Sequence, residues 1–293
     1  MNDIQGKKIV LPEGGTCIYC GANGGAGGLG EEHVVPYALG GKTTLSNASC
    51  NGCSAITSYL DGYLASATYK YLRVHSGVQS RSGHPDVLPA YVGIEGGEIT
   101  QIDLAPCDHP YFLHMPVWHP PGLMRGEAPT PEFKEPKAHV YWYVPPNMRD
   151  TLALRHGQTA EIQDKTPMPN VRTFARAVAK IAYCNAIIHY GLNGFRPLAL
   201  PDIILGRYPH ISLFVGSDRG DPPPPDPKGI LHKLTFTNVN YQKLNFYTMR
   251  LRLFAHSGTD TNGMPYYEVV IGAPGPGNTH RRTMPKLPKI ICL

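Results

Sequence analysis

Residues 17–61 contain, in order, Cys17-Ile-Tyr-Cys20, Glu31-Glu-His-Val-Val-Pro36, Leu39-Gly-Gly41 and Asn47-Ala-Ser-Cys50-Asn-Gly-Cys53. The two C-x2-C pairs offer four thiolates, and a structural zinc ion binds four such ligands in a tetrahedron at about 2.3 Å each. Gly21 and Gly52 let the backbone turn at each pair. We therefore predict one closed structural zinc site, with four unrelated thiols or a redox pair as the alternatives. Its ligands are Cys17, Cys20, Cys50 and Cys53.

Between the two pairs, Glu32 and His33 precede two valines and Pro36, a pattern of extended chain that ends at a turn. A carboxylate beside an imidazole suits a divided task, in which the carboxylate holds a hard cation and the neutral imidazole takes a proton from water. Histidine suits this role because its ordinary pKa lies near neutrality. Glu32 and His33 are therefore candidate catalytic residues, and a solvated surface pair is the alternative interpretation.

The order and spacing of these pieces resemble the zinc-bearing branch of the HNH endonucleases, over roughly residues 1–80. Ala48-Ser49-Cys50, Ile56-Thr57-Ser58 and Asp61 are similar to a bacterial subgroup of that family. The resemblance implies a β-hairpin and a helix, together called a ββα-metal module, which the zinc pins and which carry one catalytic divalent cation. It also implies hydrolysis of phosphodiester bonds in nucleic acid, with DNA as the expected substrate.

Position by position, the resemblance implies that His33 is the general base and that Glu32 binds the catalytic cation. Asn47 matches the Asn that braces the loop between the two hairpin strands by hydrogen bonds to the backbone. The family commonly has Asn or His directly after the last Cys, whereas this chain has Ser54, a poor metal ligand. Three explanations follow: a neighbour replaces this ligand, the site binds its cation weakly, or the module has lost activity.

Helix geometry suggests which neighbour replaces Ser54. Ser54, Thr57, Ser58 and Asp61 recur at three- and four-residue steps, and therefore share one face of a helix that is predicted to begin near Cys53. Asp61 is thus a candidate cation ligand, with a plain exposed acid as the equally weighted alternative. Carboxylate and water ligands suit a hard cation, so we expect Mg²⁺ or Mn²⁺ at this site.

The rest of the chain predicts an α+β fold. Apolar residues at helical spacing predict helices over residues 53–72 and 172–190. Alternation predicts a hairpin over 88–104 and strands over 137–144, 231–237, 244–254 and 266–271, which we expect to form one antiparallel sheet covered by the second helix. Residues 217–228, with Pro222 to Pro225, are expected to be a linker or an exposed loop. Two domains are predicted: a zinc-stapled ββα module in 1–80 and a larger α+β domain in 81–293 that holds substrate or a partner.

The net charge of +5 arises after residue 80, and basic clusters there and at the end of the first helix are candidate contacts with nucleic acid. For each cluster, a solvated surface is the alternative. The candidates are Lys70 and Arg73 at the end of the first helix, Arg172, Arg176 and Lys180 on one face of the second, and a basic C-terminal tail with His280, Arg281, Arg282, Lys286 and Lys289.

Two functional classes agree with these patterns. The favoured one is a metal-dependent HNH endonuclease, because Glu32 and His33 are both present. The alternative is a catalytically inactive, zinc-stapled protein that binds nucleic acid or another partner, which Ser54 would permit. The sequence has no run of about twenty apolar residues and no signal-peptide pattern, so we expect a cytoplasmic protein with no membrane contact. The oligomeric state is not predicted.

Overall fold

The computed structural model describes residues 6–79, 83–94, 97–156, 160–241, 244–275 and 289–292. Most of the predicted basic tail, including His280, Arg281, Arg282 and Lys286, lies outside the described residues. Lys289 begins strand β14 (Lys289–Cys292), but its side chain is not among those described. The contact of the tail with nucleic acid therefore stays a prediction.

The N-terminal module is a small sheet followed by a helix. Strand β3 (Thr44–Ser49) pairs in parallel with β1 (Lys8–Val10) and antiparallel with β2 (Gly30–His33). The chain reverses between β2 and β3 through the short 3-10 helix Tyr37–Leu39 and two glycines. A Cβ atom on Gly41 would lie 2.0 Å from the carbonyl oxygen of Val35, so this tight turn requires glycine. Helix α1 (Asn51–Tyr63) follows directly and completes the predicted ββα arrangement.

The helix predicted over residues 53–72 is interrupted. After α1 the chain forms a π-helical turn, Leu64–Thr68, and then α2 (Lys70–His75). The amide of Tyr69 donates to the carbonyl oxygen of Leu64, five residues back. The side chain of Tyr69 is fully buried, and its ring centroid lies 5.0 Å from that of Phe254. The wider turn thus occurs where the helix contributes a large aromatic side chain to the core.

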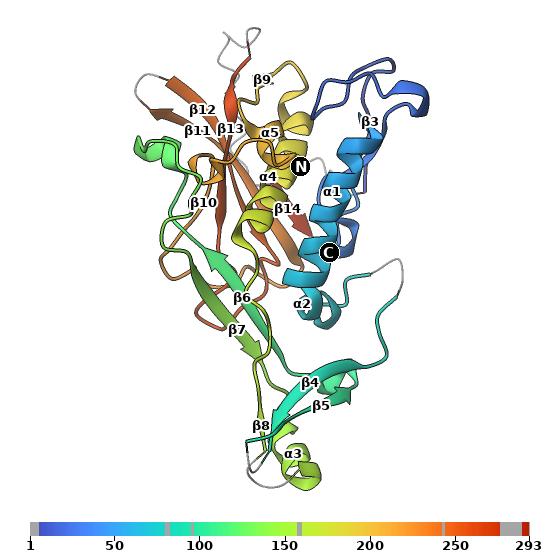
Figure 1. Ribbon diagram of the computed structural model, residues 1–293, viewed down its shortest axis with the longest axis vertical. Helices are drawn as coiled ribbons and strands as arrows, with labels where there is room; N and C mark the ends of the chain where they lie inside the picture. The colour runs from blue at the N-terminus through green and yellow to red at the C-terminus, as the bar shows by residue number, and fades with distance from the viewer. Residues whose placement is uncertain are drawn as a thin grey trace.

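Two small sheets lie between the first helices and the main sheet in the chain order. Strand β4 (Leu88–Gly93) pairs with β5 (Ile99–Leu104) on one edge and with β8 (Glu161–Ile162) on the other. Helix α3 (Met148–His156) contributes Met148 and Leu152 to a separate small core there. Strands β6 (Tyr111–Val117) and β7 (Lys137–Tyr143) form a two-stranded ribbon. This ribbon lies between the main sheet and the small lobe that is formed by β4, β5, β8 and α3 (Figure 1).

The main sheet has the order β10-β13-β12-β11-β14. The prediction that all the strands form one sheet is wrong, because both edges of β4 are already paired and β7 pairs with β6 in a separate ribbon. The strands predicted after residue 230 are confirmed as antiparallel neighbours. The remaining bounds are β9 (Phe195–Arg196), which pairs with β13, β10 (Val215–Ser217), β11 (Ile230–Tyr241), β12 (Leu244–Leu253) and β13 (Tyr267–Pro274).

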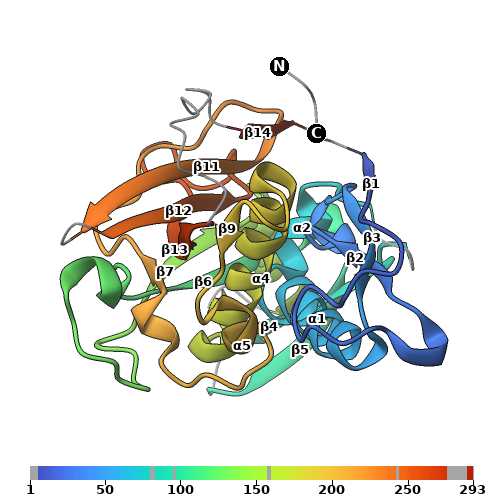
Figure 2. The same ribbon diagram turned by 90° about the horizontal axis from the view of Figure 1, so that it is seen from above.

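Helix α4 (Val171–Tyr190) is the central element of the molecule. Its N-cap residue Asn170 accepts a hydrogen bond of 3.0 Å from the amide of Thr173, and it ends at Gly191. The helix lies between the main sheet and α1, and it contacts both α1 and β13 (Figures 1 and 2). Because α4 is buried on opposite sides, it is a core helix.

In the described part of the chain, no helix combines the length and apolar character that a membrane crossing needs.

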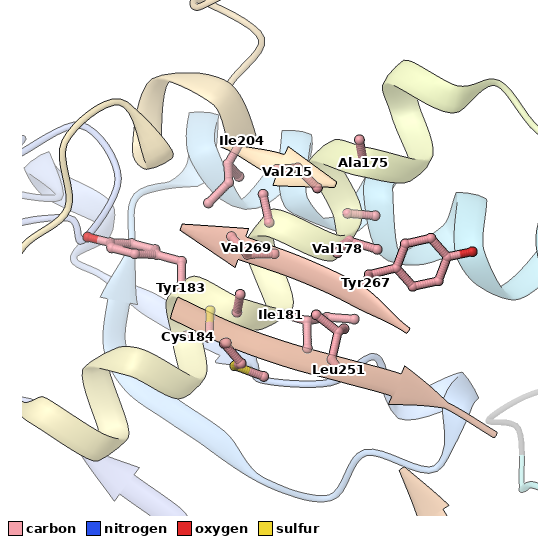
Figure 3. Close-up of a cluster of buried hydrophobic side chains, with 14 of the residues drawn as sticks. Ala175, Val178, Ile181, Tyr183, Cys184, Ile204, Val215, Leu251, Tyr267 and Val269 are labelled. Carbon is pink, nitrogen blue, oxygen red and sulfur yellow. The ribbon is translucent and has the colours of Figure 1, made fainter. Parts of the chain in front are cut away.

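One hydrophobic core joins the N-terminal module to the later chain. Ala175, Val178 and Ile181 of α4 pack against strands of the main sheet (Figure 3). The same cluster contains Leu45 and Leu60 of the N-terminal module. Short helix α5 (Leu200–Ile204) packs on α4 as well. The core therefore continues across the predicted boundary at residue 80.

The proline-rich stretch 217–228 is a loop that joins β10 to β11 within one sheet. Arg252, whose side chain is 1% exposed, donates to the carbonyl oxygens of Pro223 and Pro224 and forms a 3.0 Å ion pair with Asp226. Pro223 also accepts a hydrogen bond from the amide of Gly263. The loop is thus fixed to the sheet by a buried guanidinium, and it does not separate two domains.

Candidate functional site

The four predicted zinc ligands come together. Their sulfur atoms all lie within 4.8 Å of one another, and the sulfurs of Cys20 and Cys50 are 3.7 Å apart. Ligands at about 2.3 Å from one tetrahedral ion are separated by about 3.8 Å. Cys17 and Cys53 are buried, whereas Cys20 and Cys50 are half-buried. The cluster therefore fits a structural zinc ion, as the spacing predicted.

Backbone hydrogen bonds shape the two cysteine turns. In the first, the amide of Gly21 donates to the carbonyl oxygen of Cys17, and Gly21 has a φ of 75°. In the second, Cys50 is the N-cap residue of α1, and a hydrogen bond from the amide of Cys53 lowers the pKa of the Cys50 thiol to about 7. The amide of Ile18 donates to Ala48 of β3 at 2.9 Å. A bound zinc ion would thus join the first turn to the start of α1.

Glu32 lies at the centre of a buried charge cluster. Its side chain is 4% exposed, and its Oε1 atom is 3.0 Å from the Nζ atom of Lys180. Its Oε2 atom accepts a 2.9 Å hydrogen bond from the hydroxyl of Thr57. Both carboxylate oxygens of Asp61 also lie 3.0 Å from Lys180 Nζ. One ammonium group therefore joins the two acids that were predicted to hold a divalent cation.

Lys180 is fully buried. The sequence pattern had instead placed it with Arg172 and Arg176 on a helix face that contacts nucleic acid. The ammonium of Lys180 donates to Asp61 and to the carbonyl oxygen of His33, and it forms a 3.0 Å ion pair with Glu32. All three of these groups carry negative charge or a carbonyl dipole, so each stabilises the ammonium. Burial alone would lower the pKa of Lys180, but the carboxylates of Asp61 and Glu32 outweigh burial and raise it. Lys180 therefore stays charged, and it cannot contact nucleic acid from the surface.

Burial has the largest effect on the pKa of Asp61, the second titratable group in the cluster. It raises the pKa of Asp61 to about 6, even though the ammonium of Lys180 acts in the opposite direction, and the nearby carboxylate of Glu32 adds to the rise. The three ionised groups carry a net charge of −1. The cluster is thus nearly balanced without any further cation.

The two carboxylates do not fit a divalent cation in this arrangement. One oxygen of Glu32 accepts a hydrogen bond from Thr57 and the other forms an ion pair with Lys180, and Asp61 directs both of its oxygens at Lys180. The ammonium of Lys180 lies 3.0 Å from oxygens of both carboxylates, so it occupies the position between them that a Mg²⁺ or Mn²⁺ ion would need.

His33 follows Glu32 at the end of β2, and its side chain is half-buried. Neighbouring residues on a strand point to opposite faces, so the imidazole lies away from the carboxylate of Glu32. Its ring centroid is 6.0 Å from that of Tyr37. A partly exposed imidazole is open to water, as a general base must be. The role of His33 stays a prediction.

Asn47 and Ser54 are both in the module, with different surroundings from those expected. Asn47 lies within β3 with a φ of 56°, and its Nδ2 atom donates to the carbonyl oxygen of Leu11 at 3.1 Å. It therefore braces the segment after β1, which the parallel pairing of β1 with β3 brings alongside. Ser54 lies in the first turn of α1, and its carbonyl oxygen accepts from the hydroxyl of Thr57. Thr57, which the helical spacing placed on this face without a role, donates a hydrogen bond to Glu32.

The two arginines of α4 bind backbone carbonyl groups. Arg172 donates to Pro131 at 2.8 Å and to Pro209 at 3.1 Å. Arg176 donates to Ile204 at the end of α5, at 2.9 and 3.2 Å. Cations at helix ends satisfy carbonyl groups that lack a partner within the helix. These contacts tie loops to α4. Arg172 is exposed and Arg176 is half-buried, so their contact with nucleic acid stays a prediction.

Lys70 lines a cavity of about 280 Å³ between α2 and the small sheet of β4. Its Nζ atom lies 5.0 Å from the ring centroid of Tyr71. Lys165 and His109 line the same cavity, and His109 is 1% exposed with its Nε2 atom 3.0 Å from the carbonyl oxygen of Pro89. Arg73 is half-buried, and burial lowers its pKa. Lys70 and Lys165 are thus exposed cations at one cavity, and no motif in the sequence marked Lys165.

One comparison with known proteins finds a match, and it lies in the N-terminal module. The family model of the HNH endonucleases matches residues 17–64. The match includes the four cysteines, Glu32, His33 and Asp61, and it ends where α1 gives way to the π-helical turn. No curated protein and no solved structure matches the chain. Residues 17–64 are therefore similar to the HNH endonucleases, and Lys180 lies outside the matched segment.

Proposed function

We propose that this protein is an endonuclease that hydrolyses phosphodiester bonds in nucleic acid, with residues 17–64 as its catalytic module. The observation that carries this proposal is the placement of His33, half-buried at the end of β2, within a segment that matches the HNH endonucleases. The cysteine cluster and the core supply the rigidity that a catalytic imidazole needs. DNA as the substrate and a cytoplasmic location belong to the same proposal.

The proposed reaction is an attack of water on phosphorus. His33 accepts a proton from the water molecule as the new P–O bond forms, and the bond from phosphorus to the leaving sugar oxygen breaks. The leaving oxygen takes a proton from solvent. Cys17, Cys20, Cys50 and Cys53 would hold a zinc ion whose role is structural, because four sulfur ligands leave no position for substrate.

In the proposed reaction, no Mg²⁺ or Mn²⁺ ion is held by Glu32 and Asp61. The expected ligands Glu32 and Asp61 bind Lys180, and Ser54 is a poor ligand on its own. Glu32 instead fixes the strand position next to His33, through Thr57 and Lys180. The nucleic-acid contacts belong in this proposal to the exposed cations at the cavity, Lys70 and Lys165, together with the C-terminal tail.

Cleavage assays test the proposal. Zinc-loaded protein is incubated with plasmid DNA and, separately, with structured RNA, each with Mg²⁺, with Mn²⁺ and with a chelator. We expect His33→Ala to reduce the cleavage rate by a factor of about 10² to 10⁴, the usual contribution of a general base. His84→Ala, which changes an exposed loop histidine, is the matched control and should cleave at the wild-type rate.

Two outcomes would contradict this assignment. If His33→Ala cleaves as fast as the wild type, His33 is not the base. If neither protein cleaves but both retard nucleic acid in a gel, the chain is a zinc-stapled binding protein, the alternative that Ser54 permits.

A further inference from the structure

We infer that Lys180 is a positioning residue of the proposed nuclease site, and that its ammonium takes the place of a divalent cation between Glu32 and Asp61. The inference rests on the proposed function for its catalytic part only. Lys180 belongs to α4, outside the matched module of residues 17–64. The larger part of the chain would thus supply a component of the catalytic site.

The first support is the geometry of the ammonium group. Its three partners come from two separate elements: the ion-paired side chain of Glu32 and the carbonyl oxygen of His33 from β2, and the side chain of Asp61 from α1. The contact with the His33 carbonyl group fixes the backbone that carries the imidazole. Because Lys180 is 0% exposed, water cannot replace it in this position.

The second support is the rigidity of the helix that carries Lys180. Ala177, Ile181 and Cys184, which surround it on α4, are fully buried. The helix is held against the main sheet on its other side (Figures 2 and 3). The position of the ammonium is therefore set by the core of the whole molecule.

The third support is a parallel contact from the same helix to the cysteine cluster. The hydroxyl of Tyr183 donates to the carbonyl oxygen of Ile18 at 2.6 Å, and Ile18 lies between Cys17 and Cys20. The hydroxyl of Tyr19 lies 3.3 Å from the sulfur of Cys184. Within five residues, α4 thus contacts both the metal-binding turn and the strand of His33.

A buried ion pair on its own is weak evidence for stability, because well-packed apolar residues often do as well. A role in stability alone therefore does not explain why three charged groups meet at the strand that carries the proposed base. Positioning does explain it, since errors of about 1 Å in a catalytic group reduce rates by about 10².

The first test measures cation binding without any activity. Zinc-loaded wild type and Asp61→Asn are titrated with Mn²⁺, and free Mn²⁺ is followed by electron paramagnetic resonance. We expect the two proteins to bind Mn²⁺ equally, because Asp61 is already held by Lys180. A site of one Mn²⁺ per chain in the wild type that weakens tenfold or more in Asp61→Asn would overturn the cation replacement. This result does not depend on whether the protein is a nuclease.

The second test measures positioning. We expect Lys180→Met to reduce kcat at least tenfold with KM within twofold, and Lys180→Arg to recover part of the loss by restoring the charge. Lys228→Met, an exposed loop variant, is the control for loss of one lysine. Zinc content and thermal unfolding show whether each variant folds. Where Lys180→Met does not fold, the triple variant with Glu32→Gln and Asp61→Asn removes the charges that it leaves unpaired.

The outcomes of the second test separate the two proposals. A folded Lys180→Met, or folded triple variant, that keeps the wild-type kcat, or changes KM alone, would overturn the positioning role. A wild type that does not cleave any nucleic acid would contradict the proposed function instead, and the Mn²⁺ titration would still decide whether Lys180 replaces the cation.

Discussion

Thr57 illustrates how a single hydroxyl orients the charge cluster. Its side chain is 1% exposed, and it holds the Glu32 oxygen that Lys180 does not. Sequence spacing placed Thr57 on the correct face of α1, together with Asp61. It did not reveal the partner, because Glu32 lies 25 residues earlier and on a different element.

We expect Thr57→Val to destabilise the protein by about 1.5–3 kcal/mol, because a nearly isosteric methyl group leaves one oxygen of a buried carboxylate without its hydrogen bond. Thr57→Ser keeps the hydroxyl and should lose much less. Urea unfolding of both variants measures the difference. A Thr57→Val protein as stable as the wild type would show that this hydrogen bond has no net effect.

Some residues of the site could be predicted from the sequence, and others could not. The four cysteines and the Glu32-His33 pair follow from short-range spacing, which survives in the sequence. Lys180 does not, because its contact with His33 joins residues 147 apart. On α4 its four-residue spacing from Arg176 suggested an exposed stripe, and only the packing of α4 against α1 shows that its ammonium is buried.

At the scale of elements, local sequence patterns predicted where helices and strands occur better than they predicted which strands pair. The predicted helix over 172–190 and the predicted strands over 231–237, 244–254 and 266–271 correspond to α4, β11, β12 and β13, although β11 extends to Tyr241. Strands β10 and β14 of the same sheet were not predicted. The π-helical turn before Tyr69 was missed, because the apolar spacing is compatible with a continuous helix. The sheet assignment was wrong because alternation says which residues are strands and nothing about which edges pair.

The cysteine cluster should behave as one element with the turns that it joins. We expect Cys53→Ser to lose bound zinc and to reduce amide-exchange protection in residues 17–53, because zinc ligation contributes directly to folding free energy. Cys107→Ser, which removes an exposed cysteine, is the matched control and should keep one zinc per chain. Full zinc content and unchanged protection in Cys53→Ser would contradict a four-cysteine site.

At the scale of the whole molecule, His232 joins the N-terminal module to the main sheet. Its Nε2 atom lies 2.7 Å from the carbonyl oxygen of Leu39, and its Nδ1 atom accepts from the amide of Phe254 at 3.2 Å. This pattern requires the neutral ring, and burial lowers the pKa of His232 to about 4. The hydrophobic core and this contact both join the N-terminal module to the later chain. The boundary predicted at residue 80 follows the end of the motif, and the packing is continuous across it.

His232 predicts a loss of stability in acid. Between its ordinary pKa near 6.5 and the folded-state pKa of about 4, the unfolded chain binds a proton that the folded chain does not. Its contribution is therefore fully present above pH 6.5 and falls by up to about 3 kcal/mol as the pH drops to 4. Denaturant unfolding of the wild type and of His232→Gln, from pH 7 to pH 4, measures this. Equal pH dependence in the two proteins would contradict the neutral, buried ring.

The central claim is that the imidazole of His33 is the base in phosphodiester hydrolysis, and chemical rescue tests it most directly. The measurement is the plasmid cleavage rate of zinc-loaded His33→Ala with and without added imidazole. We predict a rate at least about 10²-fold below that of the wild type, restored in part by imidazole but not by an equal concentration of a non-basic additive. A His33→Ala protein that cleaves at the wild-type rate without imidazole would contradict the account.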